Sequence, residues 1–166
     1  MINDIKLYSK KTYTLSTFEK KKIFKLKKKN YNFKLKDQLK WFDTNIKKND
    51  IHNLLFFKKK LIGYNCLRSI NFFFCKKKKF LCKKKFLLFD TLIIDPKFRK
   101  KNLSAIILKK NLQLIRQKKK IGVLFCKNSM IDYYRKFSWQ KFNKKLFYSN
   151  YLLKTKKNLM IYDPVE

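Results

Sequence analysis

Two side chains in the second half of the sequence could take part in acid–base chemistry. Asp90 is the only carboxylate inside the apolar run 86–94, and an isolated acid there is costly to bury unless it is paired or protonated. In a regular strand Asp90 would share a face with Leu92. It is a candidate general base, although an acid that faces a lysine or the open end of a sheet would give the same pattern. Tyr134 carries a phenol, which has an unperturbed pKa of about 10. Its spacing from Met130 equally suits the buried stripe of a helix.

Cysteine and histidine are too scattered to bind a metal. The four cysteines include no pair at CxxC spacing, and His52 is the single histidine, so we expect neither a zinc site nor a redox dithiol. No signal-peptide pattern opens the sequence, and its uncharged stretches are far shorter than the roughly 20 apolar residues that span a bilayer. We therefore expect a cytoplasmic protein with no metal and no membrane span.

The formal net charge of +35 raises the question of a nucleic-acid partner. Lys and Arg together number 45, but only four of these residues are Arg, and Gly and Pro occur twice each. Lys, Asn, Phe, Ile and Tyr have A/T-rich codons, so genomic drift toward A/T explains this composition without a polyanionic partner. A dedicated nucleic-acid binder would keep more Arg, because the guanidinium group binds phosphate in a bidentate manner. We expect any nucleic-acid binding to be non-specific.

Helix and strand signals alternate along the chain. The sequence Ser16-Thr17-Phe18-Glu19 is a capping box and predicts a helix from Thr17. The predicted helices span residues 17–29, 37–47, 103–118 and 129–137. The predicted strands span residues 54–57, 61–70, 86–94, 121–126, 141–148 and 158–162. The lysine-rich segment 76–85 is expected to be a solvated loop, with a twisted strand end as the alternative.

The order of these elements predicts one α/β or α+β domain over residues 1–166. The nearly continuous apolar run 86–94 is typical of a strand that is covered on both faces. Together with the helix 103–118 and the strand 121–126, this strand makes a βαβ unit. The hairpin before the unit and the antiparallel strands after it make the sheet mixed.

The segment from Leu92 to Ser104 resembles the most diagnostic stretch of the GCN5-related N-acetyltransferase (GNAT) superfamily. In that family an apolar strand ends near a proline, and an Arg/Gln-x-x-Gly-x-Gly/Ala turn then opens a helix whose N–H groups bind the pyrophosphate of CoA. Asn102 and Ser104 replace the two glycines. Asn tolerates a left-handed backbone best among residues with a side chain, so we expect the turn to survive. An ordinary surface turn before a core helix is the alternative. The resemblance assigns the pyrophosphate to Arg99, Lys100, Lys101, Asn102, Leu103 and Ser104.

A second segment, from Asn128 to Trp139, is similar to the GNAT pattern that begins with Asn and ends with Gly-Phe. In the family the Asn binds the pantetheine arm, and a Tyr lies near the CoA sulfur as a general acid. These roles fall on Asn128 and Tyr134, with Ser138 in place of the glycine. Asn128 equally suits the N-cap of a helix.

The resemblance implies direct transfer of an acetyl group from acetyl-CoA to a primary amine. It also implies a mixed sheet of about six to seven strands flanked by about four helices. In such a fold the backbone of Leu92, Ile93 and Ile94 pairs with pantetheine, while their side chains belong to the core. The sequence identifies neither the acceptor nor the oligomeric state.

Two other functions stay open. The first is a small basic nucleic-acid- or ribosome-associated binding protein, in which aromatics interleaved with lysines stack on bases. The second is a GNAT fold without catalysis, because a fold does not by itself define a function.

Overall fold

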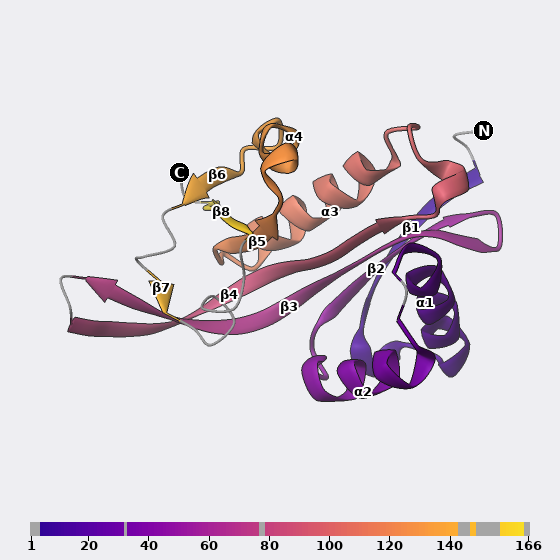
Figure 1. The fold of residues 1–166 in the computed structure, drawn as a ribbon, viewed down its shortest axis with the longest axis horizontal. Helices are drawn as coiled ribbons and strands as arrows, with labels where there is room; N and C mark the ends of the chain where they lie inside the picture. The colour runs from indigo at the N-terminus through magenta and orange to yellow at the C-terminus, as the bar shows by residue number, and fades with distance from the viewer. Residues whose placement is uncertain (1–3, 32, 77–78, 143–146, 149–156, 165–166) are drawn as a thin grey trace. The chain divides into compact units, whose positions relative to one another are not determined.

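The chain forms an α+β fold around one mixed sheet, which confirms the predicted fold class (Figure 1). The computed structural model describes residues 4–31, 33–76, 79–142, 147–148 and 157–164. In these residues the strand order is β1-β2-β3-β4-β5-β8-β6, and β7 pairs with β3. The strands are β1 Ile5–Lys11, β2 Ile51–Phe57, β3 Lys60–Lys76, β4 Lys79–Ile94, β5 Gly122–Cys126, β6 Gln140–Phe142, β7 Phe147–Tyr148 and β8 Asn158–Tyr162. The α-helices are α1 Thr17–Asn30, α2 Leu35–Asn45, α3 Leu103–Gln117 and α4 Ile131–Arg135.

Residue contacts divide the chain into two compact units. The N-terminal unit comprises residues 1–68 and 90–111, and the C-terminal unit comprises residues 69–89 and 112–166. Both β3 and β4 contribute residues to each unit. A single domain over residues 1–166 stays a prediction.

In the N-terminal unit, α1 and α2 pack on one face of the sheet. α1 begins with the predicted capping box: the hydroxyl of Ser16 accepts a hydrogen bond from the N–H of Glu19 at 3.1 Å, and the Glu19 carboxylate accepts one from the N–H of Ser16 at 2.9 Å. The apolar side chains between these helices and the strands form one cluster. Its buried members are Leu15, Ile23, Phe24, Leu26, Phe42, Leu54, Leu61, Tyr64, Cys66 and Ile93.

The other face of the same strands packs on α3. Successive side chains of a strand point to opposite faces, so Leu55 and Ile62 lie on the α3 side, although their neighbours Leu54 and Leu61 contact the α1 side. Leu103 and Ile107 are the buried residues of α3 in this second cluster. The N-terminal unit is therefore a three-layer structure with helices on both faces of the sheet.

In the C-terminal unit, β5 lies between β4 and β8. β4 and β5 pair in parallel, with Leu87 opposite Gly122 and Leu88 opposite Val123. This pairing confirms the predicted βαβ unit. Trp139, with 1% of its surface exposed, packs against Phe89 and Tyr162 at centroid distances of 6.1 and 5.8 Å. A Cβ atom on Gly122 would lie 2.7 Å from the Cδ1 of Ile115 and 3.0 Å from the Trp139 ring. A side chain at position 122 would therefore force Ile115 or Trp139 to shift.

Several element boundaries differ from the sequence prediction. β1 is absent from the prediction, because lysines obscure the alternation of Ile5 and Leu7. The expectation of a loop over 76–85 was wrong: β3 ends at Lys76 and β4 begins at Lys79, since strand pairing satisfies the backbone whatever the charge of the side chains. The helix predicted over 129–137 is a 3₁₀ helix, Asn128–Met130, followed by the short α4. The strand predicted over 141–148 coincides with β6 and β7 at its ends, and residues 143–146 lie outside the described residues.

Candidate functional site

The turn between β4 and α3 has the backbone conformation that glycine favours. After β4 a 3₁₀ helix spans Pro96–Phe98, and α3 begins at Leu103. Lys100 and Asn102 have φ angles of 60° and 52°, which lie in the left-handed region that non-glycine residues rarely adopt. Asn102 thus takes the conformation expected from its side chain. Lys100 takes it as well, although its side chain offers no such advantage.

Buried groups hold both ends of this turn. Asp95, with 1% of its surface exposed, donates its N–H to the carbonyl of Ile62 at 2.7 Å and accepts the N–H of Lys97 on its carboxylate at 3.1 Å. Burial would raise the pKa of the Asp95 carboxyl, but hydrogen bonds from Lys29 and from the Lys97 N–H hold that pKa below its usual range. At the other end Leu103 is buried against the sheet. The fold therefore fixes the turn at both ends.

The outer surface of the turn can bind an anion. Arg99, Lys100, Lys101 and Asn102 are exposed, and Ser104 is half-buried. The first N–H groups of a helix have no carbonyl partner within that helix, and the helix N-terminus carries a partial positive charge. Backbone amides and cationic side chains at such an end are the usual elements of a phosphate site.

The side chains at the end of β4 are used in packing. Leu92 and Ile94 pack on the α3 side and Ile93 on the α1 side. Thr91 has a φ angle of 59°, which is an outlier for a β-branched residue and interrupts the regular alternation of the strand. The expectation that Asp90 shares a face with Leu92 was therefore wrong.

Asp90 forms an ion pair with Arg68 of β3. The Asp90 carboxylate accepts hydrogen bonds from Arg68 Nη1 at 2.9 Å and from the Thr91 hydroxyl at 3.0 Å. Arg68 also donates from Nη2 to the carbonyl of Asn45 at the end of α2. The positive charge of Arg68 stabilises the ionised carboxylate and makes it a weaker proton acceptor. These contacts favour the alternative of a paired acid, and the role of Asp90 as a base stays a prediction.

Two charged residues near Asp90 are not singled out by the sequence patterns. Arg68 is a charged residue within an apolar strand, and this interruption could have identified it in the sequence. Lys27 of α1 is only 7% exposed, and its Nζ lies 4.5 Å from the ring centroid of Trp41. Burial lowers the pKa of Lys27, whereas the negative charge of Asp90 opposes this shift. Lys27 follows Ile23 by four residues and therefore falls on the buried stripe of α1.

In the C-terminal unit, Asn128 and Tyr134 have different surroundings. Asn128 is exposed, and its side-chain oxygen accepts a hydrogen bond from Asn158 at 2.7 Å. It caps neither helix, since Lys127 and Met130 occupy the N-cap positions, so the N-cap alternative was wrong. Tyr134 is 7% exposed and packs edge-on against Phe89 at 6.2 Å between ring centroids.

The residues predicted from the sequence thus fall into two groups. Asp90, the strand end 92–94 and the turn 99–104 belong to the N-terminal unit, whereas Asn128 and Tyr134 belong to the C-terminal unit. Ser138, which stands where the GNAT pattern has glycine, has a φ of 61°. Left-handed residues therefore occur in both segments that carry the resemblance.

Comparison with known proteins finds similarity in structure alone. No protein-family model and no curated protein sequence matches the chain. An acyl-CoA N-acyltransferase from Pseudomonas aeruginosa is 11% identical, with a TM-score of 0.67, and the match covers 94% of this chain and 98% of that one. Naa50 of Arabidopsis thaliana, in complex with the bisubstrate analogue CoA-Ac-MVNAL, is 12% identical, with a TM-score of 0.64 and coverage of 96% and 99%. An acetyltransferase of the GNAT family from Bacteroides thetaiotaomicron is 12% identical, with a TM-score of 0.61 and coverage of 94% and 86%. The chain therefore has the fold of the GNAT acetyltransferases.

Proposed function

We propose that the protein is an N-acetyltransferase that moves an acetyl group from acetyl-CoA to a primary amine of an unidentified acceptor, and that residues 1–166 act as one domain. The observation that carries this proposal is the left-handed backbone of Asn102 at the N-terminus of α3. A residue with a side chain adopts that conformation at an energetic cost. Binding of a ligand by the amides of the turn would offset this cost. The shared fold supports the same assignment.

In this proposal the N-terminal unit binds acetyl-CoA through its backbone. The turn 99–104 holds the pyrophosphate with its amides, and Arg99, Lys100 and Lys101 add attraction between charges. The strand end 92–94 pairs with the pantetheine arm through main-chain groups, because its side chains are used in packing. Asn128 binds the same arm through its side chain.

The chemical step is nucleophilic attack by a neutral amine on the thioester carbonyl. A carbon–nitrogen bond forms, the carbon–sulfur bond breaks, and the electron pair leaves on sulfur. Tyr134 donates a proton to the departing thiolate. The attacking amine loses one proton to a base, and Asp90 is the candidate within β4.

Ligand-induced stabilisation tests the binding step. At a concentration one hundred times its Kd, acetyl-CoA should stabilise the folded protein by about 2.7 kcal/mol and raise the Tm accordingly. Asn102→Glu places a carboxylate beside the pyrophosphate and should abolish this rise, whereas Asn102→Gly should preserve it. Asn71→Glu makes the same charge change at an exposed residue of β3 and is the control. Equal rises in all four proteins would reject the assigned turn.

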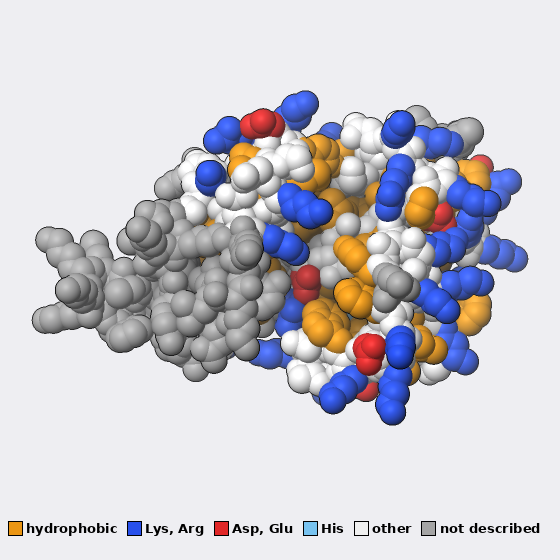
Figure 2. All heavy atoms as spheres, viewed as in Figure 1, with side chains coloured by type: hydrophobic (Ala, Val, Ile, Leu, Met, Phe, Trp, Pro, Cys, Tyr) orange, Lys and Arg blue, Asp and Glu red, His pale blue; other side chains and the backbone are white. Residues whose placement is uncertain are grey.

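A nucleic-acid-binding function is the second candidate, and exposed aromatic rings favour it. Tyr13, Phe18 and Phe33 are more than half exposed, and Lys22 lies 4.4 Å from the ring centroid of Phe18. Such rings could stack on bases beside a basic surface. Lys and Arg side chains are spread over much of the described surface in Figure 2, which fits non-specific attraction. Tight, salt-dependent RNA binding without any response to acetyl-CoA would select this function over the first.

The location of the protein is a separate question. Among the helices of the described residues, none combines the length and the apolar character that a membrane crossing needs. A cytoplasmic location stays a prediction.

A further inference from the structure

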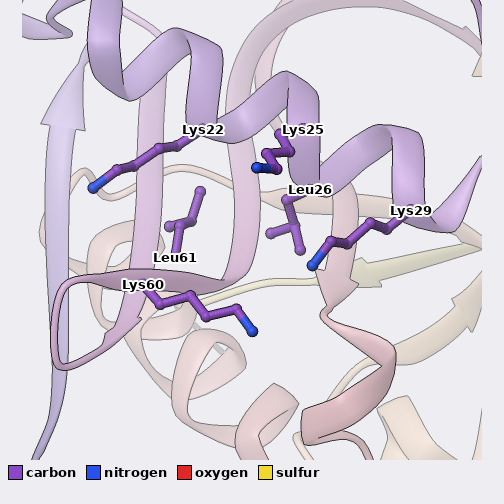
Figure 3. A pocket seen from close by; sticks show the side chains of 6 residues that line it. All are labelled: Lys22, Lys25, Leu26, Lys29, Lys60 and Leu61. Carbon is purple, nitrogen blue, oxygen red and sulfur yellow. The ribbon is translucent and has the colours of Figure 1, made fainter.

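A pocket of about 310 Å³ in the N-terminal unit is lined by lysines around an apolar floor. Leu26 of α1 and Leu61 of β3 form the floor. The surrounding residues are Lys22, Lys25, Lys29 and Lys60 (Figure 3). The three lysines of α1 follow one another at spacings of three and four residues, so they lie on the same side of the helix. This places several ammonium groups around a hollow of the size that holds a small ligand.

One buried carboxylate orients two of these lysines. Lys29 Nζ lies 2.9 Å and Lys60 Nζ lies 3.7 Å from the same Oδ2 atom of Asp95. The two side chains extend toward each other in Figure 3, although each is 40% or more exposed. Asp95 is itself fixed by hydrogen bonds to Ile62 and Lys97. Two of the four ammonium groups are thus ordered before a ligand arrives.

The charges of the pocket are not balanced. Among the described residues, Asp95 is the acid paired with the lysines of this pocket, and Lys22 and Lys25 have no carboxylate partner. Lys22 donates instead to the carbonyl of Lys59 and lies over the ring of Phe18. Four positive charges therefore face one negative charge, and an anion of charge two or three would neutralise the excess.

We propose that this pocket binds a small phosphorylated molecule, with its phosphate groups held by Lys25, Lys29 and Lys60 and its apolar part against Leu26 and Leu61. The pocket is separate from the turn 99–104 in its residues, and the proposal does not depend on acetyltransferase activity. The arrangement differs from a scattered lysine surface because Lys29 and Lys60 both lie within ion-pair distance of one buried carboxylate oxygen.

Calorimetric titration with inorganic pyrophosphate tests the proposal, in full-length protein that carries Asn102→Glu to block the turn. Lys25→Gln removes one exposed ammonium group from the pocket, and Lys36→Gln makes the same change at an exposed residue of α2 that does not line it. Lys25→Gln should weaken pyrophosphate binding about tenfold, which corresponds to about 1.4 kcal/mol. Lys36→Gln should change it by less than about twofold, because Lys36 is not one of the residues around the pocket.

Each other result would overturn the proposal. Equal weakening by Lys25→Gln and Lys36→Gln would mean diffuse attraction to the whole basic surface. Binding that Asn102→Glu abolishes would place the phosphate at the turn, which would support the proposed function and leave the pocket empty. No binding at all to the Asn102→Glu protein would exclude the pocket while leaving the acetyl-CoA experiment to decide on the turn.

Discussion

His52 should make the stability of this protein fall as the pH drops from 6.5 to 4. Its ring is fully buried, with Nδ1 at 2.9 Å from the hydroxyl of Tyr64 and Nε2 at 2.9 Å from that of Thr12. Burial, together with the positive charges of Lys27 and Lys20, lowers its pKa to about 4. The folded state therefore keeps the neutral ring at a pH where the unfolded chain, with a pKa near 6.5, binds a proton.

The magnitude follows from the difference between the two pKa values. Above pH 6.5 both states carry a neutral ring and the full contribution is present. Below pH 6.5 only the unfolded state binds the proton, so the free energy of unfolding falls by up to 1.36 kcal/mol per pH unit. The loss should be about 2 kcal/mol between pH 7 and pH 5 and about 3 kcal/mol by pH 4. Since the chain has one histidine, no other side chain has an unperturbed pKa between about 5 and 7.

Urea unfolding at half-unit steps from pH 7.5 to pH 4.5 measures this effect, with His52→Gln as the matched variant. Gln keeps hydrogen-bonding groups near Thr12 and Tyr64 but cannot titrate. The variant should be less stable than the parent at pH 7, and the difference should shrink by about 2 kcal/mol at pH 5. Parallel stability curves for the two proteins would refute the reasoning, because they would mean that His52 takes up its proton equally in both states.

Three further substitutions follow from the packing and the proposed chemistry. Ser16→Ala removes the capping box of α1 and should lower the free energy of unfolding by about 1 kcal/mol in urea; an unchanged midpoint would contradict the capping role. Gly122→Ala forces a methyl group against Ile115 and Trp139 and should cost about 1–3 kcal/mol, so an unaffected Tm would show that these side chains move aside freely. Tyr134→Phe should slow release of the CoA thiol about 100-fold with little change in the Kd for acetyl-CoA, and an unaltered rate would leave Tyr134 as a core aromatic.

The fold was predictable where a pattern has a single physical explanation. The capping box at Ser16 predicts the start of α1, and the apolar run 86–94 predicts a central strand with a helical crossover to β5. β1 escaped prediction because its partner, β2, is distant in sequence, and the pairing that stabilises it leaves little trace in a lysine-rich strand. The strand ends near 76–85 were predicted only as the alternative to a loop, because the many lysines there hide any alternation of apolar side chains.

The backbone conformation of the candidate site was predictable from the sequence, whereas its side-chain contacts were less so. Asn102 indicates a left-handed turn, and its φ of 52° agrees. Lys100 gave no such signal, since a lysine in that conformation is set by the surrounding turn rather than by its own preference. The ion pair between Asp90 and Arg68 joins residues that are far apart in sequence, and the left-handed Thr91 that redirects Asp90 has no sequence signature.

The amides of the turn between β4 and α3 can be observed directly during a titration with acetyl-CoA. In ¹H–¹⁵N correlation spectra of the full chain, the largest shift changes should occur for residues 99–105, because the proposal places the pyrophosphate against this turn, where its charge would act on the helix N-terminus. Saturation of those shifts at the concentration that raises the Tm would agree with the account. Stabilisation by acetyl-CoA with the amides of 99–105 unmoved would contradict it.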